Sequence, residues 1–185
     1  MYVPGIAFEL LDGKQAAAHA DELRALHAEV YADLRFVQGG YPPSDRGYPL
    51  DKQFRQPGFV LAEARHGDYL VGYAAGMPLR PATSWWRELT TPLPDDVTTE
   101  HPGRTFALVE LLVRAAWRRQ GIGSELHDLV LANRPEERAT LTVLPTAAPA
   151  QGAFAKWGWH KIARTRAPRS GEPVADVLLT SLPLR

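Results

Sequence analysis

The segment Arg118–Ser124, Arg-Arg-Gln-Gly-Ile-Gly-Ser, combines the residue types that bind a phosphate group. Its two glycines let the backbone approach a ligand closely, because they carry no Cβ. The apolar run before it predicts a strand and the residues after it predict a helix, so unpaired amides and a positive helix dipole meet there. Arg118 and Arg119 add fixed positive charge. The segment predicts a pyrophosphate cradle, and the alternative is a tight strand-to-helix turn that binds nothing.

Two familiar phosphate-binding patterns do not fit this segment. A Walker loop ends in Gly-Lys-Ser or Gly-Lys-Thr, and that ending is absent. A dinucleotide fingerprint needs three glycines, and the segment has only Gly121 and Gly123. The segment is therefore neither a Walker loop nor a dinucleotide fingerprint, and the class of its phosphate ligand stays open at this point.

The residues around the cradle resemble the motif of the GNAT superfamily of N-acetyltransferases. The run from Leu112 to His127 contains Arg118-x-x-Gly121-x-Gly123 between a strand and a helix, with Ala115 at the usual Pro position. A second block, residues 150–159, resembles the late helix of the family that ends in Gly-aromatic. The resemblance covers residues 105–164, and the N-terminal half fits in the order of its elements only.

The resemblance implies that acetyl-CoA is the acetyl donor. The six histidines are scattered without metal-ligand spacing, so we expect no metal site. The resemblance also implies that amides of residues 119–124 hold the pyrophosphate and that Leu111 and Val113 offer backbone groups to the pantetheine arm, like an added strand. In this fold that strand and the next splay apart, and the cofactor lies between them. The predicted cofactor contacts are Leu111, Leu112, Val113, Arg118, Arg119, Gln120, Gly121, Ile122, Gly123, Ser124 and Phe154.

Glu110 is the predicted catalytic base, because it is the only charged residue within the strand at 105–113. GNAT enzymes often use a carboxylate on this strand to take the proton of the amine. The alternative is that Glu110 only forms an ion pair with Arg104, Arg114 or another basic group. His101, Asp95 and Asp96 are weaker candidates for the base.

The chemistry of the leaving group departs from the family pattern at Phe154. The chain has no cysteine, so we expect direct attack of the amine on the thioester in a ternary complex, where positioning contributes most. Many relatives carry a Tyr hydroxyl that serves the departing sulfur, and Phe154 cannot donate a proton. Tyr41, Tyr48, Ser84 or water are the substitutes that the sequence offers.

The acceptor is predicted to be a primary amine of a small molecule, contacted by Tyr41, Trp85 and Trp86, because aromatic residues in a Pro-rich segment can wall a pocket. The alternative for the tryptophans is that their burial pins a loop to the sheet. Alternative functions are a catalytically silent CoA-binding module, a protein or peptide N-acetyltransferase, and a nucleotide-phosphate binder.

The elements that must position these residues follow from periodicity and turn residues. They predict an α/β (α+β) domain with a mixed, mainly antiparallel sheet flanked by helices, in one domain spanning residues 1–185. The expected strands are 6–11, ending at an Asp12-Gly13 turn, 59–64, 69–77, 105–113, 140–144, 159–164 and 174–180, and the expected helices are 16–35, 122–133, 150–157 and a short one within 41–57.

Composition excludes several other classes of protein. The 185 residues carry 21 basic and 21 acidic side chains, and this balance argues against a nucleic-acid partner. No apolar run is long enough for a membrane span, and the N-terminus lacks the pattern of a signal peptide. We therefore expect no membrane partner and a cytoplasmic location, and the resemblance adds homodimers as a common state of the family.

Overall fold

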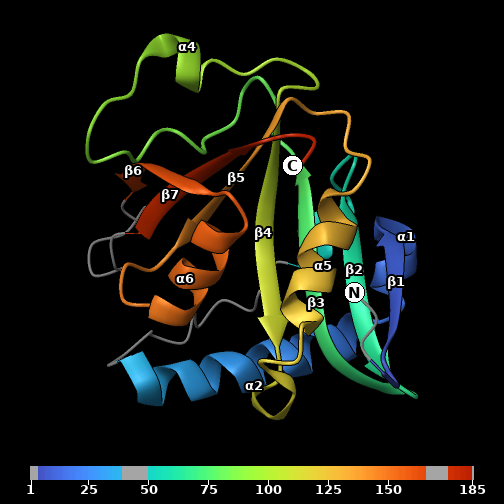
Figure 1. Cartoon of the computed structure of the whole chain (residues 1–185). Coiled ribbons are helices and arrows are strands. Elements are labelled where there is room, and N and C mark those ends of the chain that lie inside the picture. Colours follow the sequence, from blue (N-terminus) through green and yellow to red (C-terminus); the bar gives the residue numbers. More distant parts are fainter. Residues whose placement is uncertain (1–3, 39–49, 166–174, 185) are drawn as a thin grey trace. The chain divides into compact units, whose positions relative to one another are not determined.

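The computed structural model describes residues 4–38, 50–165 and 175–184 (Figure 1). Strands and helices alternate in the predicted order, with helices on the sheet. The strands are β1 (Ala7–Asp12), β2 (Val60–His66), β3 (Tyr69–Pro78), β4 (Thr105–Val113), β5 (Arg138–Val143), β6 (His160–Thr165) and β7 (Ala175–Ser181). The helices are α1 (Gly13–Ala17), α2 (Ala20–Gln38), α3 (Leu50–Phe54), α4 (Asp95–Thr98), α5 (Ile122–Leu131) and α6 (Ala148–Lys156), with a 3₁₀ turn at Ala115–Trp117.

The strands form a seven-stranded mixed sheet in the order β1-β2-β3-β4-β5-β7-β6. The pairs β1/β2, β2/β3, β5/β7 and β6/β7 are antiparallel, whereas β4 and β5 are parallel. This confirms the predicted fold class. The chain divides into two compact units, one made of Met1–Met77 with Leu108–Ala132 and the other of Pro78–Ala107 with Asn133–Arg185. The two units are described separately below.

The N-terminal helices of the first unit differ from the prediction. The Asp12-Gly13 turn is wrong, because Asp12 ends β1 and caps α1. The Gln15 amide donates to the Asp12 carboxylate at 2.8 Å, and the Gln15 side chain accepts from the Asp12 amide at 2.9 Å. This reciprocal capping stabilises a short helix where the sequence predicted one only from Ala16 onward. The expected helix at 16–35 is therefore two helices, α1 and α2.

The first unit packs helices on both faces of its strands. Leu23, Leu26 and Val30 of α2 belong to a buried cluster with Tyr73 of β3 and Leu112 of β4. A second contact lies on the opposite face, where a Cβ added at Gly72 would meet the Leu126 side chain of α5 at 3.2 Å. The hairpin between β2 and β3 is confirmed, with Gly67 at a φ of 58° in its turn.

The second unit contains the long segment 78–104 and the last strands. The structure describes this segment along its whole length. It includes α4, and Leu89 makes a β-bridge to Thr165 of β6. The strand pair β6/β7 and the helix α6 lie close to their predicted bounds, and Gly158 follows α6 with a φ of 85°. Left-handed backbone of this kind favours glycine and ends the helix as predicted.

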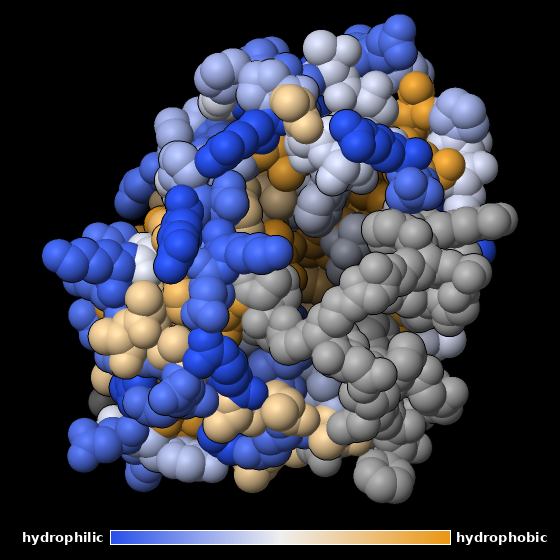
Figure 2. Space-filling view, turned by 180° about the vertical axis from the view of Figure 1, so that it is seen from behind, coloured by the Kyte–Doolittle hydropathy of each residue, from blue (hydrophilic) through white to orange (hydrophobic). Residues whose placement is uncertain are grey.

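Hydrophilic side chains cover most of the coloured surface on the face shown in Figure 2, and hydrophobic ones gather there in small groups. In the part of the chain that the structure describes, none of the helices has both the length and the apolar character that a membrane crossing requires.

Candidate active site

The first turn of α5 and the loop before it form a concave set of backbone amides. Arg119 and Gly121 have left-handed backbone, with φ angles of 65° and 89°. Gly121 occupies the N-cap position and no side chain caps the helix there. Alternating backbone of this kind points successive N–H groups to one side, as in anion-binding nests, and the helix dipole adds to the effect. The structure thus supports an anion site at the predicted segment.

The side chains of this loop leave the amides uncovered. Arg118 donates its Nε to the Val113 carbonyl at 2.9 Å, and Gln120 donates its side-chain amide to the Ala116 carbonyl at 3.3 Å. A Cβ added at Gly123 would meet a single neighbour, the Val113 side chain at 3.9 Å. The helix start therefore has room for a ligand, and the exposed Arg119 is available to add charge.

The edge of β4 that faces away from β3 is the next element of the site. The Arg114 amide donates to the Val71 carbonyl at 2.9 Å, and the Leu112 carbonyl lies 2.7 Å from a Cβ added at Gly72. Because backbone groups alternate along a strand, those of Leu111 and Val113 point to the opposite edge.

The pairing of β4 with β5 along that edge ends before either strand does. Among the described residues, the parallel ladder between β4 and β5 ends at the pair Ala107↔Thr140, although both strands continue. Backbone groups at Leu111 can therefore accept an extended partner, as the resemblance implies. Leu112 differs, since its side chain is buried in the cluster with α2 and its carbonyl faces Gly72. We leave Leu112 out of the proposed cofactor contacts.

Glu110 lies on the face of β4 that α2 covers. Its side chain is 9% exposed, and its carboxylate accepts the Tyr31 hydroxyl at 3.2 Å and 3.4 Å from its two oxygens. The His27 Nε2 lies 3.5 Å from Glu110 Oε2. The alternative interpretation of Glu110 is an ion pair with Arg104, Arg114 or another basic group. Neither arginine is its partner, and the basic group beside it is His27. Arg114 pairs with Glu29, and Arg104 donates to the carbonyls of residues 96 and 99.

Glu110 differs from the other buried carboxylates that the structure describes. Each of those has a permanently charged partner, Arg or Lys, between 2.6 and 3.0 Å away. Glu63 pairs with Arg65, Glu100 with Arg138, Glu136 with Arg134, and Asp176 with Lys161 and Arg164. The two described partners of Glu110, a phenol and an imidazole, carry no permanent positive charge, which sets this carboxylate apart from the others.

Comparison with known proteins agrees with this arrangement. The family model described as "Acetyltransferase (GNAT) family" matches residues 14–159. The chain belongs to the GNAT family of acetyltransferases. Its members are acyltransferases that use acetyl-CoA, so this GNAT chain is an acyltransferase as well. No curated protein sequence matches it.

Solved structures share the GNAT fold at low identity. NAA60 of Arabidopsis thaliana in complex with acetyl-CoA has a TM-score of 0.68 at 13% identity, covering 96% of this chain and 98% of that one. PaiA N-acetyltransferase of Thermoplasma acidophilum in complex with coenzyme A has a TM-score of 0.63 at 10% identity, covering 95% and 98%. Nourseothricin acetyltransferase has a TM-score of 0.61 at 16% identity, covering 97% and 99%.

Phe154 of this GNAT chain lies in an aromatic cluster in the second unit. Its side chain is 7% exposed and packs edge-on against Trp157 and Trp159, with ring centroids 5.5 and 5.8 Å apart. The ring supplies apolar surface and no proton. Among the substitutes that the sequence offered for the missing hydroxyl, Ser84 is exposed, and Tyr41 and Tyr48 lie outside the described residues.

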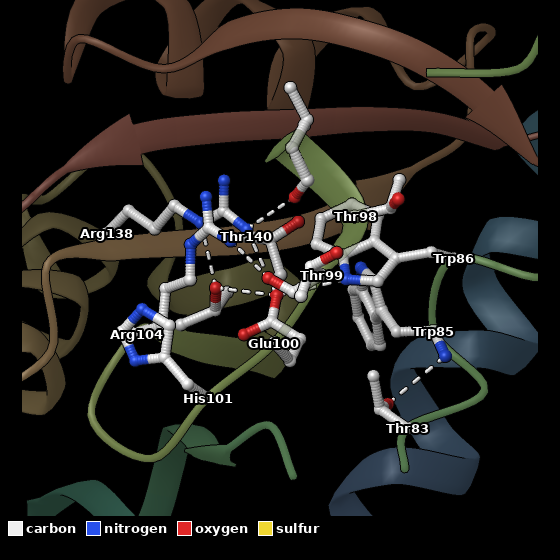
Figure 3. Close-up of polar contacts among 12 residues, drawn as sticks. Thr83, Trp85, Trp86, Thr98, Thr99, Glu100, His101, Arg104, Arg138 and Thr140 are labelled. Atoms are coloured by element: carbon white, nitrogen blue, oxygen red, sulfur yellow. Dashed lines mark hydrogen bonds and ion pairs between the residues drawn. The ribbon is translucent and has the colours of Figure 1, made fainter. Parts of the chain in front are cut away.

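The two adjacent tryptophans have different environments. Trp86 is buried and donates its indole N–H to Glu100 at 3.0 Å, which is the packing role that the sequence left open (Figure 3). Trp85 is half-buried, and its indole nitrogen has no hydrogen-bond partner among the described residues. That nitrogen is itself buried, so the half-buried ring, and not the N–H group, is what Trp85 could offer to an acceptor molecule. Tyr41, the third predicted acceptor contact, lies outside the described residues.

The alternative bases are less suited to the role than Glu110. Asp95 and Asp96 are exposed in the first turn of α4. His101 is also exposed, with its Nε2 3.8 Å from Glu137. All three residues are exposed, whereas Glu110 is buried on β4, so Glu110 remains the candidate for the base.

Sequence reasoning missed Tyr31 and His27. Both lie on the α2 stripe that also carries Leu23 and Val30, and they are four residues apart, so they share one helix face. Two polar aromatic residues within an otherwise apolar stripe were the available signal.

Proposed function

We propose that this chain transfers the acetyl group of acetyl-CoA to the primary amine of a small molecule, with Glu110 as the base. The observation that carries the proposal is the environment of Glu110 on β4. Its carboxylate is buried, and in the described part of the chain it has no arginine or lysine partner. Acetyl transfer needs a neutral amine, and a carboxylate that is not neutralised by arginine can take its proton.

The residues present fit acetyl-CoA. The nest at Arg119 and Gly121 offers amides to a pyrophosphate, and the free edge of β4 offers the backbone of Leu111 to the amides of the pantetheine arm. The bound donor supplies a thioester whose carbonyl carbon accepts the amine. The chain itself has to orient the two substrates, take one proton and exclude water.

The proposal includes further contacts to the cofactor and to the acceptor. Arg118, Gln120, Ile122 and Ser124 belong to the same loop and first turn and would border the phosphate groups. Phe154 would pack against the cofactor. A small acceptor is favoured by the half-buried aromatic ring of Trp85 in segment 78–104, because such a ring can form one wall of a pocket for a small amine.

Binding and turnover test the proposal separately. Calorimetric titration with acetyl-CoA measures the donor site, and thiol release with a panel of small amines and short peptides measures transfer. We expect micromolar binding of acetyl-CoA and CoA release that depends on a small amine. Turnover of peptides alone would move the acceptor class to proteins, and binding without turnover of any amine would favour the silent module.

Gly121→Asp is the variant that tests the donor site. It places a negative side chain in left-handed backbone where the phosphate would lie, so we expect acetyl-CoA affinity to fall below detection. Gly152→Ala is the matched control, since nothing lies within 4 Å of a Cβ added there and the affinity should not change. Equal affinity of a folded Gly121→Asp protein and the wild type would refute the loop assignment.

A further inference from the structure

The contacts of Glu110 suggest how its proton leaves the site. Glu110 is 9% exposed, and its neighbour His27 is 17% exposed, so the imidazole has more contact with water than the carboxylate has. The distance of 3.5 Å from His27 Nε2 to Glu110 Oε2 is long for a hydrogen bond. Catalytic hydrogen bonds are often long before substrates bind, so this distance is compatible with proton transfer in the substrate complex.

Tyr31 holds both partners in place. Its hydroxyl donates to Glu110, 3.2 Å and 3.4 Å from the two carboxylate oxygens, so one donor is shared between them. Its ring packs against the His27 imidazole, with centroids 4.3 Å apart and an angle of 31°. The spacing of four residues on α2 makes this contact possible. Tyr31 thus fixes the orientation of the carboxylate and of the imidazole at once.

We propose that His27 relays the proton that Glu110 takes from the amine to solvent, and that Tyr31 positions the pair. This rests on the proposed acetyl transfer to an amine. The nitrogen forms a bond to the acetyl carbon, and the C–S bond breaks with its electron pair on sulfur. The nitrogen proton passes to Glu110, then to His27 Nε2, and then to water. The thiolate takes its proton from solvent, which needs no acid at Phe154.

Other charged and titratable groups lie on the elements around this pair. On α2 and β4, Glu29 and Arg114 form a pair with each other. On β3, the Tyr73 hydroxyl is buried in the same core. Among the described side chains, those that contact the Glu110 carboxylate are His27 and Tyr31.

The test compares His27→Ala with His19→Gln. His19 is the matched control, because its Nδ1 lies 3.0 Å from another buried carboxylate, Glu63, which already pairs with Arg65. For His27→Ala we expect kcat with the best amine to fall at least about tenfold, a modest share of a proton-transfer contribution. The KM for acetyl-CoA should be unchanged, and imidazole in the buffer should restore kcat. His19→Gln should match the wild type.

Tyr31→Phe separates positioning from relay. It should lower kcat and change the pH profile of kcat, and imidazole should not restore it, because the imidazole of His27 is still present. Full kcat of His27→Ala across the pH range would overturn the relay, and so would a loss that imidazole does not rescue in a folded protein. A wild type that binds acetyl-CoA but turns over no amine would refute the proposed function itself, and this is measured before any variant.

Discussion

Glu100 and Glu110 are both buried glutamates, one in each unit, and their partners differ. One oxygen of Glu100 accepts from the Trp86 indole at 3.0 Å, from the Thr105 hydroxyl at 2.8 Å and from Arg138 at 3.0 Å (Figure 3). Glu110 contacts a phenol and an imidazole. Burial alone therefore does not identify a catalytic carboxylate.

The difference has a physical consequence for each residue. Arg138 pairs with the Glu100 carboxylate, and its guanidinium also donates to Thr105 and to the Val97 carbonyl, so this group of contacts ties segment 78–104 to β4 and β5. An ion pair of this kind is costly to break. Glu110 has no such anchor in the described residues. We propose that Glu100 serves stability and that Glu110 serves chemistry.

The largest expected effect concerns the role of Glu110 as the base. Glu110→Gln removes the base but keeps the shape and an acceptor for Tyr31, so we expect kcat to fall roughly 10²–10⁴-fold. The Tm should stay the same or rise, because no cation loses its partner. Steady-state kinetics and thermal unfolding measure the two effects, with acetyl-CoA affinity as the control for the donor site. Equal turnover at every pH would remove Glu110 as the base.

The next effect concerns Glu100 and its cationic partner. Arg138→Met leaves the Glu100 carboxylate buried without its cation, which should cost about 3–5 kcal/mol of unfolding free energy. For a chain of this size that corresponds to a fall in Tm of roughly 10 °C. Chemical denaturation at neutral pH gives the free energy.

The double variant Glu100→Gln with Arg138→Met is the control for Arg138→Met. Gln carries no charge and still accepts from Trp86, so the double variant should be more stable than Arg138→Met alone. If it is less stable, the cost comes from lost packing of Arg138 and not from an uncompensated charge.

The smallest effect concerns Asp176, a carboxylate with cationic partners near the surface. Burial raises the pKa of Asp176, but hydrogen bonds and charges from Lys161 and Arg164 outweigh it, so the pKa lies below its usual value. A lowered folded-state pKa gives stability that is present above the unfolded pKa of about 3.9 and is lost as the pH falls through the folded value.

Asp176→Asn should therefore be less stable than the wild type at neutral pH, and the gap should close in acid. Both cations are about half exposed, so solvent screens them and the gap should also shrink at high salt. Unfolding free energies across the acid range measure it. A gap that stays constant down to the acid limit would show that Asp176 acts through packing.

Local signals predicted much of the fold and the donor half of the site. The strand 105–113 and the hairpin around Gly67 agree with the structure because alternation and turn residues act within a few positions. The capping box at Asp12 is also local, but the Asp12-Gly13 pair predicts a turn at this position. The cap starts α1 ahead of Ala16, and the break between α1 and α2 is a separate feature that the prediction lacks.

The sequence by itself determined the family and the glycine loop at the start of α5, because a strand, a flexible turn and a helix start are contiguous in the chain. Only the tertiary structure decided what each buried carboxylate does. Tyr31 is 79 residues before Glu110, and Arg138 is 38 residues after Glu100. Such pairs form because α2 packs on β4, and because β5 lies beside β4. No spacing in the sequence distinguishes a buried carboxylate that pairs with arginine, such as Glu100, from one that contacts a phenol and an imidazole, such as Glu110.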